Sequence, residues 1–354
     1  MRKKRKTLPK EFREMLKETG VNDLRAVFDK CDLNATGGYS KGNAFSFYEI
    51  PDDLVYWLVE QGADIDFVDM YGRTPLHQHS GIRGGRVEIF IELGADINKP
   101  DRYGDTPIHM AAGSGFNVAA VKALLRAGAN PMAVNNAGEV PLVRALLRAN
   151  NIDLENLATV AEVLLASGTP ITEQMRKEVL RIGENFEFHR ENFNKDFLPM
   201  TEAALNRIYE LFGVEPVARR RMHDGISPII PAGADWKDQY NELWDLLIPS
   251  SGPAKTVQGE VIRITGRVRD EIYRNGGANW DGYFNKMVDD LLMHLTSQSS
   301  LAKDRLEEVK KIVGEIQQNG NGSDEELLYL CESAVLWVLA NPSPIPLDPP
   351  EYNR

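Results

Sequence analysis

The segment Asp101–Ala112, with the sequence DRYGDTPIHMAA, carries the clearest structural signal in this 354-residue chain. Thr106 is a good N-cap for a helix, and Pro107 suits the first helical position, where its missing N–H costs nothing. The apolar pair Leu124-Leu125 follows, and then the triplet Gly128-Ala129-Asn130. A glycine at this point is suited to end a second helix in the left-handed conformation. The stretch therefore predicts a helix, a tight turn and a second helix, followed by a projecting hairpin.

The same pattern recurs along the chain. The equivalent glycines are Gly62, Gly94, Gly128 and Gly168, so the first two intervals are similar and the third is longer. Apolar residues stand seven, four and three positions before each glycine, which is one face of a helix. Self-similarity at a nearly constant period predicts a solenoid in which neighbouring copies share one continuous core.

These residues resemble the ankyrin-repeat family, whose pattern runs D-x-x-G-x-T-P-L-H-x-A-A and ends G-A-D-x-N. Asp101–Ala112 matches closely, and so does Asp69–His77, although Gln78-His79-Ser80 departs from the alanine pair. The third copy is weaker, because Asn135, Val140 and Val143 replace the aspartate, threonine and histidine. Its longer spacing predicts an extended first helix or a longer loop around 148–156.

Degenerate copies extend the array toward the amino terminus. Leu24–Phe28 with Cys31-Asp32-Leu33-Asn34 predicts the second helix of a first repeat, since Cys31 precedes Ala63 by the same interval that separates Gly62 from Gly94. Gly42–Phe47 and Asp52–Gly62 supply another divergent copy. The resemblance thus covers residues 10–171 and implies an all-α solenoid.

The resemblance also implies a function, which is binding a partner protein through the hairpin tips and first-helix surfaces that line a concave groove. The variable positions of the family motif give the candidate contact residues: Met70, Tyr71, Arg73, Ile82, Arg102, Tyr103, Asp105, Ser114, Asn136, Glu139 and Arg148. Tyr71 and Tyr103 stand out, since aromatic side chains dominate interface energetics. The alternative is that each tyrosine only packs on its neighbouring hairpin.

The histidines favour a structural role. The resemblance gives His77 and His109 a capping role, in which the imidazole bonds the threonine and the hairpin backbone. His77 and His79 stand two residues apart on a helix and point in different directions, so we expect no shared metal ion.

The rest of the chain predicts further helices. Residues 172–234 form a helical extension and linker, with helices from 172 toward 189 and over 201–212. Residues 235–341 form an all-α C-terminal domain, with an amphipathic helix over 257–273 and a central helix over 327–340 that Ser323 and Glu326 cap. The Pro-rich tail, 342–354, is expected to be extended and mobile.

A polar group within 257–273 leaves two interpretations open. Glu260, Arg263 and Arg267 share one side of the helix and form either an ion-paired network or a polar site. Gly259 and Gly266 each cost a helix about 1 kcal/mol relative to alanine. Their presence indicates either close approach of another helix or room for a ligand.

Composition narrows the class of protein. The formal net charge is −11, which argues against a general nucleic-acid binder. Residues 1–35 carry 10 basic and 6 acidic side chains, a local net charge of +4. The basic tail at 1–9 includes Arg2, Lys3 and Lys4. This tail is either a solvated segment or a contact for nuclear import or nucleic acid. Two distant cysteines fit a reducing compartment. With no long apolar run and no secretory signal, we expect a cytoplasmic monomer.

No sequence signature of an enzyme is present, and we expect no catalytic residue, metal or cofactor. The leading hypothesis is a non-enzymatic scaffold that binds one protein partner. The phrase TVQGEVIRITGRV (256–268) resembles a C-terminal extension of some bacterial ankyrin proteins, which suggests an immunity or antitoxin-type inhibitor of a basic toxin. The alternative is that the C-terminal domain is a ligand-binding or enzymatic module, regulated by the ankyrin array and using Glu260, Arg263, Arg267 and His294.

Overall fold

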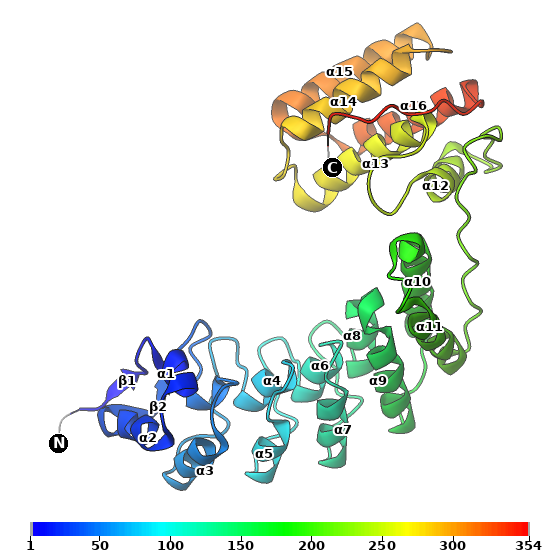
Figure 1. The fold of residues 1–354 in the computed structure, drawn as a ribbon. Helices are drawn as coiled ribbons and strands as arrows, with labels where there is room; N and C mark the ends of the chain where they lie inside the picture. The colour runs from blue at the N-terminus through cyan, green and yellow to red at the C-terminus, as the bar shows by residue number, and fades with distance from the viewer. Residues whose placement is uncertain (1–2, 353–354) are drawn as a thin grey trace. The chain divides into compact units, whose positions relative to one another are not determined.

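A computed structural model of the chain describes residues 3–352, which form two compact units (Figure 1). The first, called the repeat unit here, runs to Phe186 and includes Asn194–Val217. The second, the C-terminal unit, consists of Glu187–Phe193 and the chain from Ala218 onward. The helical extension and linker expected over 172–234 is thus shared between the two units. Both units are mostly helical, as the sequence predicts.

A small parallel sheet opens the repeat unit. β1 (Arg5–Thr7) pairs with β2 (Cys31–Thr36), and α1 (Phe12–Glu18) and α2 (Val21–Lys30) connect the two strands. The side chains of the basic start are exposed, as expected of a solvated tail, but its backbone is not free. Lys4 also donates to the carbonyl oxygen of Phe28 at 2.8 Å. Arg2 lies outside the described residues.

Four pairs of helices follow and stack side by side. The first helices, α4, α6 and α8, form one row and the second helices another, with the hairpins between successive pairs (Figure 1). Along the chain the pairs are η1 (Ala44–Ser46) with α3 (Asp52–Glu60), α4 (Pro75–Ser80) with α5 (Val87–Glu92), α6 (Pro107–Ala112) with α7 (Val118–Arg126), and α8 (Pro141–Arg148) with α9 (Leu154–Ala166).

The glycines that end the second helices behave as the sequence predicts. Gly62, Gly94, Gly128 and Gly168 have φ between +83° and +95°, in the region that only glycine adopts without strain. The last pair is also longer, as expected from its spacing. Its first helix has 8 residues instead of 6, a turn of 3-10 helix (η2, Asn151–Asp153) follows, and its second helix has 13.

Two further helices follow the repeats, and the segment Glu187–Phe193 at their junction belongs to the C-terminal unit. α10 (Glu173–His189) and α11 (Leu198–Phe212) follow the repeats, with a 3-10 turn (η3, Arg190–Asn192) between them. α11 packs on α9 and buries Leu205, Ile208 and Phe212. It ends at Gly213 in the left-handed conformation, as predicted.

The C-terminal unit is a bundle around one core. Its helices are α12 (Trp236–Leu247), α13 (Val257–Asn275), α14 (Gly282–Thr296), α15 (Lys303–Asn319) and α16 (Asp324–Ala340). α16 packs against α12, α13 and α15, and its Trp337 is fully buried, which confirms a central helix. Ser323 and Glu326 make the predicted capping box.

The proline-rich tail is extended, as predicted, but it is held against the C-terminal unit. The N–H of Val257 donates to the carbonyl of Ile345 at 2.8 Å, and the N–H of Leu347 donates to the carbonyl of Lys255 at 3.2 Å. Tyr352 is only 5% exposed. The expectation of a mobile tail is therefore wrong for residues 342–352, because the N-terminal end of α13 supplies hydrogen-bond partners for the tail backbone. Residues 353–354 lie outside the described residues.

Candidate functional site

The side chains of Asp69, Asp101 and Asn135 each close one hairpin tip. Asp101 Oδ1 accepts from the backbone N–H groups two and four residues later, at 2.8 and 3.0 Å. Asp69 makes the same two bonds in the preceding hairpin, at 2.8 and 2.9 Å. In the third copy the amide oxygen of Asn135 makes them at 3.0 and 2.9 Å. The replacement of aspartate by Asn135 therefore preserves the geometry of the tip.

Histidines tie two of the first helices, α4 and α6, to the hairpin that follows. His77 Nδ1 accepts from the N–H of Thr74 at 3.1 Å, so Nε2 carries the proton and donates to the carbonyl of Asp105 at 2.9 Å. His109 makes the equivalent contacts one repeat later and reaches the carbonyl of Glu139 at 3.1 Å. Burial lowers the pKa of both imidazoles. The structural role expected for these histidines is confirmed.

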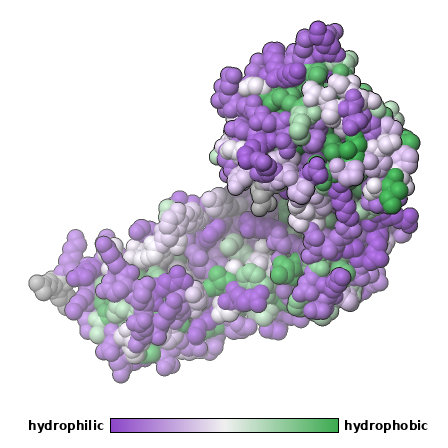
Figure 2. Space-filling model, turned by 45° about the horizontal axis from the view of Figure 1, so that its top comes forward, coloured by the Kyte–Doolittle hydropathy of each residue, from purple (hydrophilic) through white to green (hydrophobic). Residues whose placement is uncertain are grey.

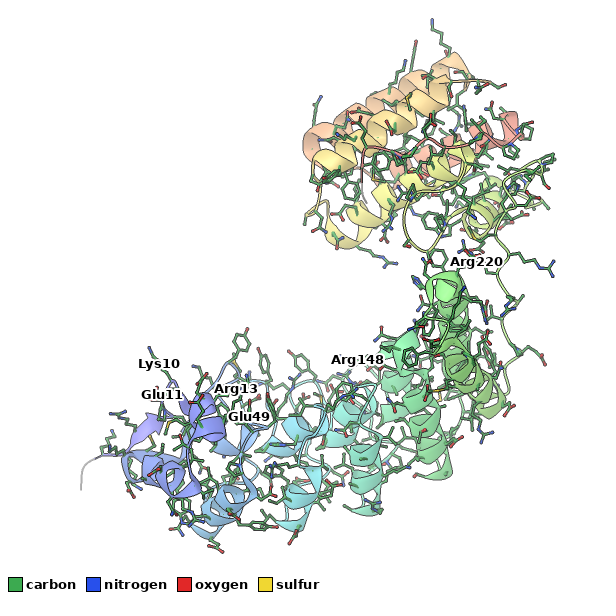
Figure 3. The ribbon with its side chains drawn as sticks, viewed as in Figure 1. Lys10, Glu11, Arg13, Glu49, Arg148 and Arg220 are labelled. Atoms are coloured by element: carbon green, nitrogen blue, oxygen red, sulfur yellow. The ribbon has the colours of Figure 1, made fainter. Side chains whose placement is uncertain are left out.

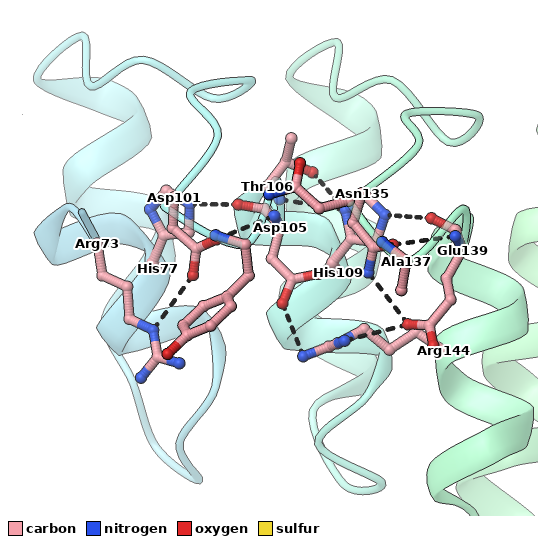
Figure 4. A network of polar contacts seen from close by, with 12 residues as sticks. Arg73, His77, Asp101, Asp105, Thr106, His109, Asn135, Ala137, Glu139 and Arg144 are labelled. Atoms are coloured by element: carbon pink, nitrogen blue, oxygen red, sulfur yellow. Dashed lines mark hydrogen bonds and ion pairs between the residues drawn. The ribbon is translucent and has the colours of Figure 1, made fainter. Parts of the chain in front are cut away.

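A buried polar network lies beneath the second and third tips (Figure 4). Arg144 lies 2.7 Å from Asp105 and 3.1 Å from Glu139, and Asn135 donates to Asp105 at 2.8 Å. Burial raises the pKa of Glu139, but the hydrogen bonds from Asn135 and Arg144 lower it more, so it lies below the usual value. Asp105 is only 1% exposed. Its prediction as a contact residue is therefore corrected: the carboxylate faces Arg144 in the interior.

The other candidate contact residues lie at or near the surface. Those exposed are Met70, Arg102, Tyr103, Asn136 and Arg148. Those half-buried are Tyr71, Arg73, Ile82, Ser114 and Glu139. Arg148 is at the opposite end of the row of repeats from Lys10, Arg13 and Glu49 (Figure 3). The structure thus spreads the candidates along the array, and only part of them gather at one place.

That place is a groove of about 650 Å³ at the first hairpin tips. Tyr71, Arg73 and Tyr103 line it, together with residues that sequence reasoning missed, among them Tyr39, Tyr48, Lys10 and Arg13. The missed signal is spacing, because Tyr39 precedes Tyr71 by the same interval that separates Tyr71 from Tyr103.

The charged side chains of the groove are mostly paired. Arg13 Nε lies 2.7 Å from Glu49 Oε1, and its guanidinium lies 5.0 Å from the ring of Tyr48. Burial raises the pKa of Glu49, but the hydrogen bond from Arg13 and other nearby donors lower it more, so Glu49 is ionised at neutral pH. Arg73 lies 3.3 Å from Asp101 and 5.3 Å from the ring of Tyr71. These contacts hold two of the tyrosine rings in place from one side.

Neighbouring hairpins are also bonded to one another. Asn34 Oδ1 accepts from the N–H of Asp64 at 2.8 Å, and Asp66 and Asn98 make the same bond to the hairpin that follows, at 3.0 and 2.9 Å. Asn34 therefore occupies the repeat position one copy before Asp66. This bond is consistent with the degenerate first repeat that the sequence predicts, although Cys31–Thr36 forms the strand β2 after the helix ends at Lys30.

In the C-terminal unit, two of the three polar residues on α13 meet. Glu260 and Arg263 are 0% and 2% exposed and 2.7 Å apart, whereas Arg267 is exposed and takes no part in their contact. The hydroxyl of Tyr352 donates to Glu260 Oε1 at 2.6 Å, and the N–H of Ala254 donates to Oε2 at 2.9 Å. Both carboxylate oxygens are thus satisfied within the unit, which favours the ion-paired network.

Packing or backbone bonds account for the other polar candidate of this unit, His294, and for two further residues, Gly266 and Arg220. His294 is buried, and burial lowers its pKa. Gly266 faces Trp244, since a Cβ there would overlap with the indole ring. Arg220 (Figure 3) donates to the carbonyls of Asp245, Trp244 and Ile248, and burial lowers its pKa.

The visible surface is mainly hydrophilic, with small separate hydrophobic patches on both units (Figure 2). Among residues 3–352, no helix is long and apolar enough to cross a membrane. A family model described as ankyrin repeats (3 copies) matches residues 46–135, the segment that contains the two best hairpins. No curated protein matches the chain. The stacked helix pairs, the glycine-ended second helices and the family match agree that residues 46–135 form ankyrin repeats.

Proposed function

We propose that this chain is a non-enzymatic scaffold that binds a partner protein through the hairpin tips and first-helix surfaces of the repeat unit. Ankyrin repeats generally mediate protein–protein interactions. One observation at the second tip carries the proposal for this chain. Arg102 and Tyr103 are exposed, and their side chains make no hydrogen bond or ion pair within residues 3–352. An exposed aromatic ring and a neighbouring arginine that have no role in the fold are typical of an interface hot spot.

In the same hairpin, buried residues stabilise the fold and exposed residues are available for binding. Asp101 closes the tip, and Asp105 holds the network beneath it, so both are needed for the fold. Of the residues between them, Gly104 has a φ of +76° that favours glycine, whereas Arg102 and Tyr103 are free to vary without loss of the scaffold. We expect substitutions at the exposed positions to change binding and leave stability nearly unchanged.

The test is an affinity pull-down from the native lysate, read by mass spectrometry. It compares the wild-type chain with the double variant Tyr71→Ala/Tyr103→Ala. Tyr56→Ala is the matched control, because Tyr56 is 38% exposed on α3, away from the tips. We expect one protein to be captured by the wild type and by the control, and lost with the folded double variant. Equal capture by all three would place the binding surface elsewhere.

A finer form of the proposal is an immunity or antitoxin-type inhibitor. Its support is the formal net charge of −11, which complements a basic partner such as a nuclease. The association with such a partner should then weaken as salt rises. The alternative, a ligand-binding or enzymatic C-terminal unit, has less support because both oxygens of Glu260 are already bonded within the unit.

A further inference from the structure

Three hairpin tips in succession carry a tyrosine. Tyr39, Tyr71 and Tyr103 follow one another at one constant interval, a single repeat, and all three line the groove of about 650 Å³. We call them the tyrosine ladder. Tyr39 is 87% exposed and Tyr103 54%, while Tyr71 is half-buried between them. The ladder stops at the next tip, where Ala137 takes the equivalent place. An array of rings of this kind is unnecessary for the fold, since the tip that Asn135 closes has no ring.

The spacing of the ladder is set by the stacking of the repeats. Packed helices lie about 8–10 Å apart, so successive tips repeat at about that distance. Backbone bonds between hairpins fix the interval: the N–H of Arg102 donates to the carbonyl of Tyr71 at 3.0 Å, and the N–H of Met70 donates to the carbonyl of Ser40 at 2.9 Å. A polyproline II helix advances about 9 Å in each three-residue turn. A segment in that conformation therefore presents the same face to each ring in turn.

The chemistry of the rings fits the same ligand. A polyproline II backbone makes no internal hydrogen bonds, so its carbonyl oxygens remain free to accept from the hydroxyls of Tyr39 and Tyr103, whereas the hydroxyl of Tyr71 already bonds the side chain of Tyr39. Aromatic-lined grooves bind proline rings through flat apolar contact, at a low cost in conformational entropy because the ligand is already extended. Arg13 lies over the ring of Tyr48 and Arg73 over that of Tyr71, so the groove is also partly organised before binding.

Charge adds a second requirement for the ligand. Arg13 and Arg73 are paired with Glu49 and Asp101. Two exposed charged residues that line the groove, Lys10 and Glu14, have no ion pair within residues 3–352, so the ligand needs an acidic group near Lys10 and none near Glu14. A carboxylate on the ligand would complement this ammonium group. The chain's own proline-rich tail is not free for this purpose, because Tyr352 is buried within the C-terminal unit.

We propose that the tyrosine ladder binds a proline-rich segment of the partner protein in the polyproline II conformation, with prolines at every third position and an acidic residue near Lys10. The proposal rests on the proposed function, since it names the class of partner for part of the same face.

The experiment is selection from a random dodecapeptide library against the full chain, followed by calorimetric titration of the most enriched peptide. We expect enriched peptides to share prolines at i, i+3 and i+6 with at least one aspartate or glutamate. Tyr39→Ala should weaken the peptide's binding roughly fivefold or more, as for an interface hot spot, and Lys10→Glu should weaken it as well. Tyr56→Ala, with its side chain on α3, should leave the affinity unchanged.

Other outcomes overturn the inference. These are an absence of enrichment, enrichment of peptides without the regular proline spacing, or an unchanged dissociation constant in the Tyr39→Ala variant. Because Tyr39 is 87% exposed, loss of folding does not confuse the result. If the native partner is still lost with Tyr71→Ala/Tyr103→Ala while no such peptide is selected, partner binding at the tips stands and the proline-rich specificity is rejected.

Discussion

His79 shows how a departure from the repeat pattern is accommodated by a single residue. The family has alanine at this position, and Ala111 occupies it in the next copy. The preceding copy, however, has only a short 3-10 turn, Ala44–Ser46, as its first helix. His79 fills the gap: it donates from Nε2 to the carbonyl of Phe45 at 2.9 Å and accepts at Nδ1 from the N–H of Arg86 at 3.0 Å. The histidine compensates for the missing helix.

This buried imidazole makes stability depend on pH. Burial lowers the pKa of His79 from 6.5 to about 4, so the unfolded chain binds its proton first as the pH falls. The free energy of unfolding should therefore be at its full value above pH 6.5 and fall by up to about 3 kcal/mol as the pH approaches 4. Urea unfolding at several pH values and the NMR titration of His79 measure both quantities. A His79 that titrates near its ordinary pKa would contradict the prediction.

Arg144 holds together the buried network beneath the hairpin tips. Its guanidinium is the charge partner of Asp105, which is 1% exposed. Arg144→Met leaves that carboxylate buried without its cation, which costs about 3–5 kcal/mol for a buried pair. Arg148→Met, at an exposed position one helical turn later, should change stability by less than about 0.5 kcal/mol. Equal effects of the two substitutions in urea unfolding would show that the network contributes little.

The sequence predicts the ends of helices and strands best where neighbouring residues determine them. Threonine–proline starts and glycine ends place the helices of the repeats, and Ser323 with Glu326 places the start of α16. The strand Arg5–Thr7 and the held tail are different, because partners distant in the sequence decide them. Tyr352 and Glu260 are 92 residues apart, and no local pattern links them. For the same reason only part of the groove could be predicted: Tyr71 and Tyr103 follow from the motif, whereas Tyr48 and Arg13 reach it through tertiary packing.

Two glycines in helices of the C-terminal unit give a matched test of close packing. A Cβ at Gly266 in α13 would overlap with the indole of Trp244 in α12, whereas one at Gly314 in α15 would meet nothing within 4 Å. Gly266→Ala should therefore destabilise the unit by about 1–3 kcal/mol through overpacking. Gly314→Ala should stabilise it by about 0.5–1 kcal/mol through helix propensity. Thermal unfolding of both variants decides the matter, and a stable Gly266→Ala would reopen the interpretation that this glycine leaves room for a ligand.

At the scale of the whole molecule, the two units are stabilised in different ways. In the repeat unit the core residues are supplied by neighbouring copies, so its surface is free to vary. In the C-terminal unit the last described residues return to the start of α13 and cover its ion pair. Gln258 Nε2 donates to the carbonyls of Asn341 and Ser343 at 2.8 and 2.7 Å, and Tyr352 completes the shell of Glu260. The tail is thus part of the fold of this unit.

Deletion of residues 344–354 tests that role. It removes the acceptor of the Val257 N–H and the hydroxyl that bonds Glu260, leaving a buried charged pair one donor short. A hydrogen bond to a charged group contributes about 1.5–3 kcal/mol, so the C-terminal unit should lose at least that much stability. Tryptophan fluorescence reports it, because Trp236, Trp244, Trp280 and Trp337 lie in this unit. Hydrogen exchange of the Val257 amide should accelerate as well. Asp348→Ala, which changes only an exposed tail side chain, should have neither effect. If the deletion behaves like this control, the tail does not contribute to the stability of the unit.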